Sequence, residues 1–240
     1  IFQGEYSNGE KWNGKGKEYN EKDQLLFEGE YINGKKNGKA NEYYKDGLLK
    51  FDGEYINGRK SGIGKEFYLD GKLLIFEGEY LNGKRWNGKG IEYNENNEFI
   101  FEGEYIDGIK TGKIREYFEN GILKFDGECL NGLRNENGKE YNENGDLLFE
   151  GRYINGEKWT GKIKEYYDNG NLKLECEYNN GEKNGKAKGY YEDGLLKFDG
   201  LYSNDLRKGK GKEYGISGLI EFEGEYLDGN RLRGKDYEYN

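Results

Sequence analysis

The side chains with the clearest chemical potential in this sequence are carboxylates that recur in pairs. Glu28 and Glu30 are two residues apart, so in a strand they would project from the same face. Glycoside hydrolysis uses two carboxylates, one as general acid and the other as base or nucleophile. The same pair recurs along nearly the whole chain and no copy is distinguished from the rest. A charged, solvated face therefore explains the pattern better than a catalytic site.

Other routes to catalysis or metal binding are closed by what the sequence lacks. The 240 residues contain no His, which removes Ser-His-Asp and Cys-His catalysis and every His-ligated metal site. The carboxylates do not follow the ligand order of an EF-hand. Gly14-Lys15-Gly16 lacks the spacing and the closing Lys-Ser or Lys-Thr of a phosphate-binding loop. We therefore expect no catalytic residues, no cofactor and no metal ion.

The carboxylates belong to a motif that repeats along the chain. Phe-acidic-Gly-Glu-Tyr, or a close variant, recurs every 24 or 25 residues, and Leu174 replaces the Phe of one copy. The repeats start near residues 2, 27, 51, 76, 101, 125, 149, 174, 198 and 222. A fixed period of this length indicates a repeat architecture. We expect one continuous array over residues 1–240, and a fragment of a longer chain, because the sequence starts with Ile1 inside a repeat.

Each repeat is predicted to form two short strands. Alternation over residues 25–32 gives an aromatic face, with Phe27 and Tyr31, and a largely acidic opposite face. Gly29 lies between the two rings, and we expect it and its equivalents to leave room for a ring over the backbone. The second strand is predicted to end on an aromatic residue in every repeat: Tyr19, Tyr43, Phe67, Tyr93, Tyr117, Tyr141, Tyr166, Tyr190, Tyr214 and Tyr239.

Glycine pairs mark two turns in each repeat. Asn33-Gly34 supplies the positive φ values of a tight hairpin turn, and Asp46-Gly47 is expected to do the same at the opposite edge. A lone hairpin is marginally stable, so stability must come from stacked neighbours. The predicted fold is therefore all-β: an elongated, twisted antiparallel β-meander, a single-sheet array of about ten two-stranded hairpins.

The motif Phe76-Glu77-Gly78-Glu79-Tyr80, followed by Asn82-Gly83, Gly88 and Gly90, resembles the MORN repeat family. The resemblance covers essentially the whole chain in register. Family members often carry His before the second Gly, where this chain has Asn37 or Asn87, and the period here is slightly longer. The Tyr-rich Gly-Leu-Leu-Lys variant is similar to a bacterial and protist branch. The resemblance implies an antiparallel β-meander that serves as a scaffold, with membrane or phosphoinositide contact, dimerisation and cytoskeletal organisation credited to relatives.

A longer period runs through the array and is marked by tryptophan. Trp12, Trp86 and Trp159 are 74 and 73 residues apart, and Leu232 takes the corresponding place in the tenth repeat. Each is predicted to lie in a hairpin loop one residue longer than the shortest loops. One interpretation is duplication of a three-repeat block, with each Trp packed over its own loop. The other is a row of aromatic contacts for a periodic partner.

Charge is predicted to be polarised between the two edges of the array. Basic residues gather in the loops that join the first and second strands, and acidic residues, such as Asp46 and Asp70, in the opposite turns. The candidate partner or lipid contacts are Lys35, Lys36, Lys84, Arg85, Lys110, Lys113, Lys183, Arg207 and Lys208, together with Trp12, Trp86 and Trp159. The alternatives are cations that keep edges soluble and unpaired, or a basic rail for anionic lipid headgroups or an acidic protein.

The two cysteines occupy positions that other repeats fill with Tyr or Gly. Cys129 replaces the Tyr of the sixth repeat and Cys176 the Gly of the eighth. Four strands would separate them by roughly 19 Å, well beyond the reach of a disulfide. We expect reduced, half-buried thiols, which fit a cytosolic protein.

These features together favour a non-enzymatic scaffold for protein–protein or membrane-surface attachment. A protein partner is expected, and an anionic membrane lipid is the alternative. Nucleic acid is disfavoured because the net charge is -9 and the isoelectric point is 5.0. The expected location is cytoplasmic, or peripheral to a membrane or the cytoskeleton. Alternative functions are an interaction module of a larger enzyme or of a toxin–antitoxin-type protein, or a self-assembling element that associates through its ends or edges.

Overall fold

Two compact units make up the part of the chain that the structure describes, residues 1–239. In this computed structural model the first unit runs from Ile1 to Ile114, and the second unit begins at Arg115. The boundary lies inside one strand, β10 (Ile109–Tyr117). The expectation of one continuous array over residues 1–240 therefore stays a prediction.

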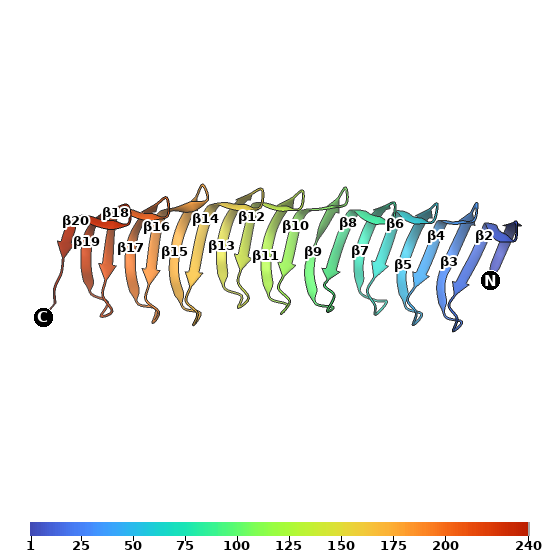
Figure 1. The fold of residues 1–240 in the computed structure, drawn as a ribbon, viewed down its shortest axis with the longest axis horizontal. Coiled ribbons are helices and arrows are strands. Elements are labelled where there is room, and N and C mark those ends of the chain that lie inside the picture. Colours follow the sequence, from blue (N-terminus) through green and yellow to red (C-terminus); the bar gives the residue numbers. More distant parts are fainter. Residues whose placement is uncertain (240) are drawn as a thin grey trace. The chain divides into compact units, whose positions relative to one another are not determined.

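All regular elements of the described residues are β-strands. The first unit holds β1 (Phe2–Ser7), β2 (Glu10–Tyr19), β3 (Leu25–Ile32), β4 (Lys35–Tyr43), β5 (Leu49–Ile56), β6 (Arg59–Phe67), β7 (Leu74–Leu81), β8 (Lys84–Tyr93), β9 (Phe99–Ile106) and the first part of β10. The second unit holds the rest of β10 with β11 (Leu123–Leu130), β12 (Leu133–Tyr141), β13 (Leu147–Ile154), β14 (Glu157–Tyr166), β15 (Leu172–Asn179), β16 (Glu182–Tyr190), β17 (Leu196–Ser203), β18 (Leu206–Tyr214), β19 (Ile220–Leu227) and β20 (Asn230–Asp236). Within each unit the strands stand side by side in chain order (Figure 1).

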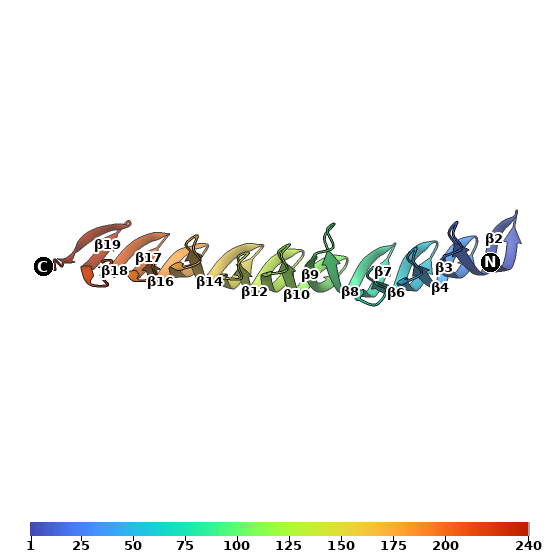
Figure 2. The same cartoon turned by 90° about the horizontal axis from the view of Figure 1, so that it is seen from below.

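Consecutive strands of each unit pair antiparallel. The pairing runs without a break from β1 to β9 in the first unit and from β11 to β20 in the second. Twenty strands give ten hairpins, so the predicted all-β antiparallel meander is confirmed. Hairpins contain a register shift, such as the one between Gly53 and Tyr55. Because such a shift bends a strand, the ribbons of each unit are curved rather than flat (Figure 2).

The two kinds of turn differ in backbone conformation. Asn33 and Gly34 have φ values of 50° and 75°, which confirms the tight two-residue turn. At the opposite edge Gly47 has φ 86°, while Asp46 is not in the left-handed region. The amide of Tyr44 donates to Leu48 O at 2.8 Å, so this loop is wider. The prediction that Asp46-Gly47 would form the same turn as Asn33-Gly34 is wrong.

The core is a row of aromatic rings on one face of the strands. Phe27 and Tyr31 are 1% and 5% exposed, which confirms the predicted aromatic face. The Phe27 ring meets Tyr31 of its own repeat and Tyr55 of the next, with centroids 5.8 and 5.7 Å apart in edge-to-face geometry. Phe27 is therefore held between the tyrosines of two repeats, as are Phe51, Phe76, Phe149 and Phe198, a packing that joins neighbouring hairpins.

Glycine is required where a ring or a facing strand lies close to the backbone. A Cβ on Gly29 would lie 2.9 Å from Cζ of Phe27, and one on its equivalent Gly53 would lie 2.5 Å from Cζ of Phe51, so the predicted ring over the backbone is confirmed. A Cβ on Gly151 would lie 2.2 Å from the backbone oxygen of Thr160. Gly189 is different, since its Cβ would come no nearer than 3.6 Å to Phe198.

The tryptophans lie in strands and not in the turns. Trp12 belongs to β2, where Tyr6 pairs with Lys11 and Glu5 pairs with Asn13, so Trp12 is the unpaired residue of a bulge. Trp86, Trp159 and Leu232 occupy the same place in their hairpins. The predicted loop position is therefore wrong, because the extra residue is absorbed by a β-bulge. The equivalence of Leu232 with the tryptophans is confirmed.

Two smaller predictions are also corrected by the structure. Nine of the ten predicted strand-terminal aromatics, from Tyr19 to Tyr214, end their strands. Tyr239 lies beyond β20, which ends at Asp236. Cys129 and Cys176 are free thiols but are fully buried rather than half-buried. Burial raises the pKa of Cys176 to about 11, so this thiol stays protonated at neutral pH.

Substitution of Gly151 by Ala is expected to destabilise the second unit by about 1–3 kcal/mol, because the new methyl group overlaps the facing strand. Gly189→Ala in the same unit has room for its methyl group and should be neutral or stabilising by up to about 1 kcal/mol. Chemical denaturation followed by circular dichroism measures both. Equal destabilisation by the two variants would contradict the steric account.

Candidate binding edges and the ion pairs that shape them

A glutamate, a tyrosine and a cation from successive strands meet at the junction of two repeats. The Tyr31 hydroxyl donates to Glu18 Oε1 at 2.6 Å, and Lys36 Nζ lies 3.0 Å from Glu18 Oε2. Lys36 Nζ also lies 3.7 Å from the centroid of the Phe27 ring. The carboxylate of one repeat is thus held by a charge-assisted pair from the next, above the aromatic core. We call this arrangement the junction triad.

The junction triad recurs along both units. It is formed by Glu66 with Tyr80 and Arg85, by Glu92 with Tyr105 and Lys110, and by Glu140 with Tyr153 and Lys158. The side chains of Glu66 and Arg85 are about one-fifth exposed, so the pair is only partly screened by water. Partly buried pairs of this kind contribute more than exposed ones.

The pKa values of Glu18, Glu92 and Tyr31 are shifted by their triad partners and by burial. Burial opposes ionisation of Glu18, but the hydrogen bonds from Tyr31 and Lys36 outweigh it and lower the pKa of the carboxyl. The pKa of Glu92 is lowered in the same way against burial, by Lys110 and Tyr105. Burial and the bond to Glu18 raise the pKa of Tyr31. The carboxylate is therefore ionised and the phenol neutral.

Five of the candidate contact cations are engaged in ion pairs within the fold. Lys36 pairs with Glu18 at 3.0 Å, Arg85 with Glu66 at 2.9 Å, Lys110 with Glu92 at 2.7 Å, Lys183 with Glu165 at 2.5 Å and Arg207 with Glu213 at 2.6 Å. Their charges are therefore neutralised by carboxylates within the fold. The remaining candidates Lys35, Lys84, Lys113 and Lys208 are exposed, and their role as partner contacts stays a prediction.

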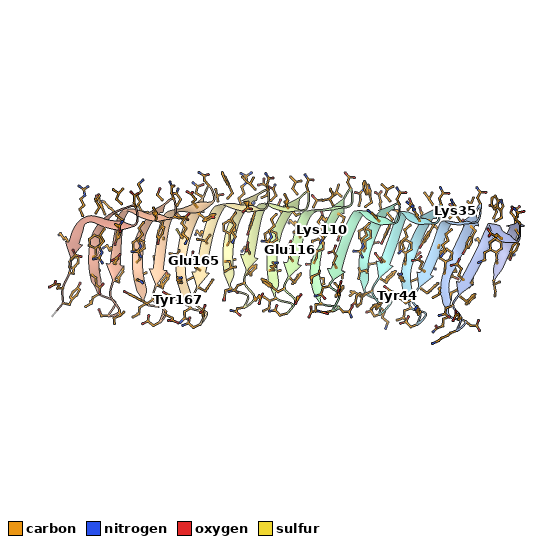
Figure 3. All side chains as sticks on the ribbon, viewed as in Figure 1. Lys35, Tyr44, Lys110, Glu116, Glu165 and Tyr167 are labelled. Carbon is orange, nitrogen blue, oxygen red and sulfur yellow. The ribbon has the colours of Figure 1, made fainter. Side chains whose placement is uncertain are left out.

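The edge of each unit that carries the Asn-Gly turns and their equivalents, here the Asn-Gly edge, presents aliphatic side chains that sequence reasoning missed. Figure 3 places Lys35 at this edge and Tyr44 at the opposite edge of the first unit. Lys35 pairs across the hairpin with Ile32, and Lys84 with Leu81. Both aliphatic side chains are exposed. Strand alternation could have predicted these exposed aliphatic residues, because it places the residue before each Asn-Gly pair on the side away from the core.

The Asn-Gly edges of the two units differ in charge. In the first unit the residue after the turn is basic in three successive hairpins, at Lys35, Arg59 and Lys84. In the second unit exposed carboxylates stand at or next to the turns, at Glu157 and Asp205. In the second unit the predicted basic edge is therefore mixed in charge, because Lys208 is also exposed there, and one long basic edge stays a prediction.

The tryptophans pack toward the following repeat rather than over their own loop. The backbone oxygens of Trp12 and Trp86 accept hydrogen bonds from Gly34 N and Gly108 N, both at 2.9 Å. A Cβ on Gly108 would lie 3.4 Å from Trp86 Cε3, so the ring lies against the next turn. This corrects the interpretation of a Trp packed on its own hairpin. Trp12 and Trp159 remain partly exposed at the Asn-Gly edges of their units.

The face opposite the aromatic core carries paired charges of both signs. Lys17 lies 2.9 Å from Glu28, and Lys139 lies 3.0 Å from Glu150. The predicted largely acidic face is therefore wrong, because lysines of each second strand neutralise glutamates of the first. These pairs are well exposed and contribute little individually.

Neither a metal centre nor a spanning helix is found in the described part of the chain. Among residues 1–239, no three His, Cys, Asp or Glu side chains come together in a way that could hold a metal ion. The same residues include no helix with the length and apolar character needed to cross a bilayer.

Comparison with known families gives one match. Residues 137–155 and 159–180 match the family described as the MORN repeat variant. Residues 137–180 therefore carry two MORN repeats. The two matched MORN copies are adjacent and lie within β12 to β15, and the other hairpins share their motif and their antiparallel geometry. MORN repeats are non-enzymatic modules that generally bind proteins or membranes.

Matches to whole proteins are weaker. No curated protein matches the chain. Among solved structures, the TcdB2-TccC3-Cdc42 crystal structure is 12% identical with a TM-score of 0.21, covering 89% of this chain and 13% of that chain. The TcdB2-TccC3 crystal structure is 9% identical with a TM-score of 0.21, covering 89% of this chain and 17% of that chain. The chain thus spans less than a fifth of the length of these solved chains.

The junction triads are expected to limit stability at both ends of the pH scale. Glu18 and Glu92 have lowered pKa values in the fold; their contribution is present above the usual value of 4.5 and is lost as pH falls through the folded pKa. The pKa of Tyr31 is raised above 10.0, first by burial and then by Glu18; its contribution is complete below 10.0 and is lost as pH rises above that value and through the folded pKa. Thermal unfolding across the pH scale should show a central plateau with two falling limbs. A midpoint that stays level down to about pH 3 would contradict the acid limb.

Proposed function

We propose that this chain is a non-enzymatic scaffold that attaches to anionic membrane surfaces through the Asn-Gly edge of its first unit. The observation that carries the proposal is a repeated pair of exposed residues. Ile32 faces Lys35, Ile56 faces Arg59 and Leu81 faces Lys84 across three successive hairpins. The aliphatic members are 47%, 53% and 42% exposed.

An aliphatic side chain beside a cation suits the boundary between headgroups and acyl chains. The apolar side chain enters the boundary, while the ammonium or guanidinium group meets lipid phosphate. Trp12 is exposed on the same edge, and Trp favours this depth in a bilayer. Ile106 and Ile109 extend the exposed aliphatic surface to the next hairpin.

Because other cations are paired within the fold, Lys35, Arg59 and Lys84 would be the main electrostatic contacts with lipid. Lys36 and Arg85 are committed to junction triads, so they are not available for lipid without loss of stability. A basic residue near an anionic surface contributes about 1 kcal/mol. Three edge cations would then contribute about 3 kcal/mol, or about a hundredfold in partitioning. A peripheral membrane location follows from this mechanism.

Replacement of Lys35, Arg59 and Lys84 together by Ser is expected to weaken binding to anionic liposomes about a hundredfold, because the phosphate contacts are lost. Binding of the unchanged protein should fall with added salt. Sedimentation with vesicles of phosphatidylcholine and phosphatidylserine, with and without a polyphosphoinositide, gives the partition coefficients.

A matched control removes the same charge from the opposite edge. Lys22, Lys45 and Lys72 are exposed in the wider turns of the first unit, and their replacement by Ser should leave most of the binding intact. Absence of binding by the unchanged protein would reject membrane attachment and direct the search to a protein partner of this edge. Equal losses in the two triple variants would reject the Asn-Gly edge as the contact.

A further inference from the structure

The Asn-Gly edge of the second unit is apolar and acidic. Leu130 and Leu133 face each other across one hairpin and are 53% and 50% exposed. Leu206 and Leu227 are exposed at the two hairpins nearest the carboxyl end of the unit. Exposed apolar side chains that recur along one edge indicate a contact surface.

Carboxylates accompany these aliphatic side chains and outnumber the exposed cations: Lys208 is exposed near Leu206, while cations next to the turns pair within the fold. Glu157, Asp205 and Asp228 are exposed at or next to the turns. Arg134 is paired with Glu116 at 2.7 Å and Lys183 with Glu165 at 2.5 Å, both within the fold. The surface that remains for a partner is therefore negative, and charge complementarity favours a basic ligand.

The spacing of the turns matches an α-helix. Successive hairpins are two strands apart, or about 9.6 Å at about 4.8 Å per strand. Seven residues of an α-helix rise about 10.5 Å. A helix laid along the edge would therefore present one residue per heptad to each turn. The hairpin at Asn180-Gly181 carries Asn179 and Glu182 in place of aliphatic residues, so the helix would need a polar residue at that contact.

The turns are rigid before any partner arrives. Asn155 and Gly156 have φ values of 50° and 90°, and Gly156 N donates to Arg134 O at 2.8 Å. The corresponding amide of Gly229 donates to Arg207 O at 3.0 Å. These two turns are thus tied to the preceding repeat, which reduces the ordering that binding would require.

We infer that the Asn-Gly edge of the second unit docks a basic amphipathic α-helix of a partner protein. The helix places apolar residues against Leu130, Leu133, Leu206 and Leu227, and its Lys or Arg residues meet the three carboxylates. This contact is separate from the membrane contact proposed for the first unit and does not depend on it. Together the two edges would make the chain an adaptor between an anionic surface and a basic helix.

A synthetic helix of about 28 residues tests this inference. The peptide carries Leu at every seventh position, Gln at the contact with Asn180-Gly181 and Lys on both flanks, and a matched peptide carries Glu in place of Lys. Isothermal titration with the full chain should detect the Lys peptide and show binding at least about tenfold weaker for the Glu peptide. Glu157→Gln, Asp205→Asn and Asp228→Asn together should weaken the Lys peptide about tenfold.

The control removes the same charge from the opposite edge of the second unit. Glu143→Gln, Asp168→Asn and Glu192→Gln replace exposed carboxylates of the wider turns, and this variant should bind the Lys peptide like the unchanged chain. The inference is overturned if the Lys peptide does not bind, if the Glu peptide binds equally well, or if the control variant loses as much affinity as the edge variant. Circular dichroism of the variants establishes that each is folded.

Discussion

The structure depends on charge pairing across the junctions between repeats. Glu66 ends up partly buried beside the aromatic core, and its partners Tyr80 and Arg85 belong to the next repeat. A buried carboxylate without such partners would be strongly destabilising, so a hairpin is stable only beside its neighbour. The edge-to-face contact of Phe51 with Tyr80 joins the same two repeats. The ion pair and the aromatic contact therefore join the same two repeats.

This constraint decides which charges can act outside the fold. One cation from the second strand of each hairpin, such as Lys36, turns inward over a Phe ring, while its neighbour Lys35 stays exposed. The two differ by one residue, and strand alternation sends them to different sides. The exposed residues after the turns are basic at three hairpins of the first unit, whereas carboxylates stand beside three turns of the second, and the two proposed contacts rest on this difference.

Much of the fold follows from the sequence, because the repeat forces local and global signals to agree. The Phe27 and Tyr31 positions, the Asn33-Gly34 turn and the glycine beneath each ring were all predicted from periodicity and turn chemistry. The inward-facing lysines were not predicted. A Lys next to a turn suggests a solvated side chain, and only the three-dimensional position of Glu18 shows that Lys36 is paired. The bulge at Trp12 was also missed, since an extra residue in a hairpin can lengthen a loop or bulge a strand, and only the register distinguishes the two.

A double-mutant cycle on Glu66 and Arg85 tests the central claim that charge pairing across a junction couples two repeats. Glu66→Gln, Arg85→Gln and the double variant are compared by chemical denaturation, with Glu77 and Lys65, a well-exposed pair 3.0 Å apart, as the control cycle. We expect a coupling free energy of about 1–3 kcal/mol for Glu66 with Arg85 and below about 0.5 kcal/mol for the control. Additive effects in the first cycle would contradict the account and leave the aromatic contacts and the backbone pairing of β6 with β7 to couple the repeats.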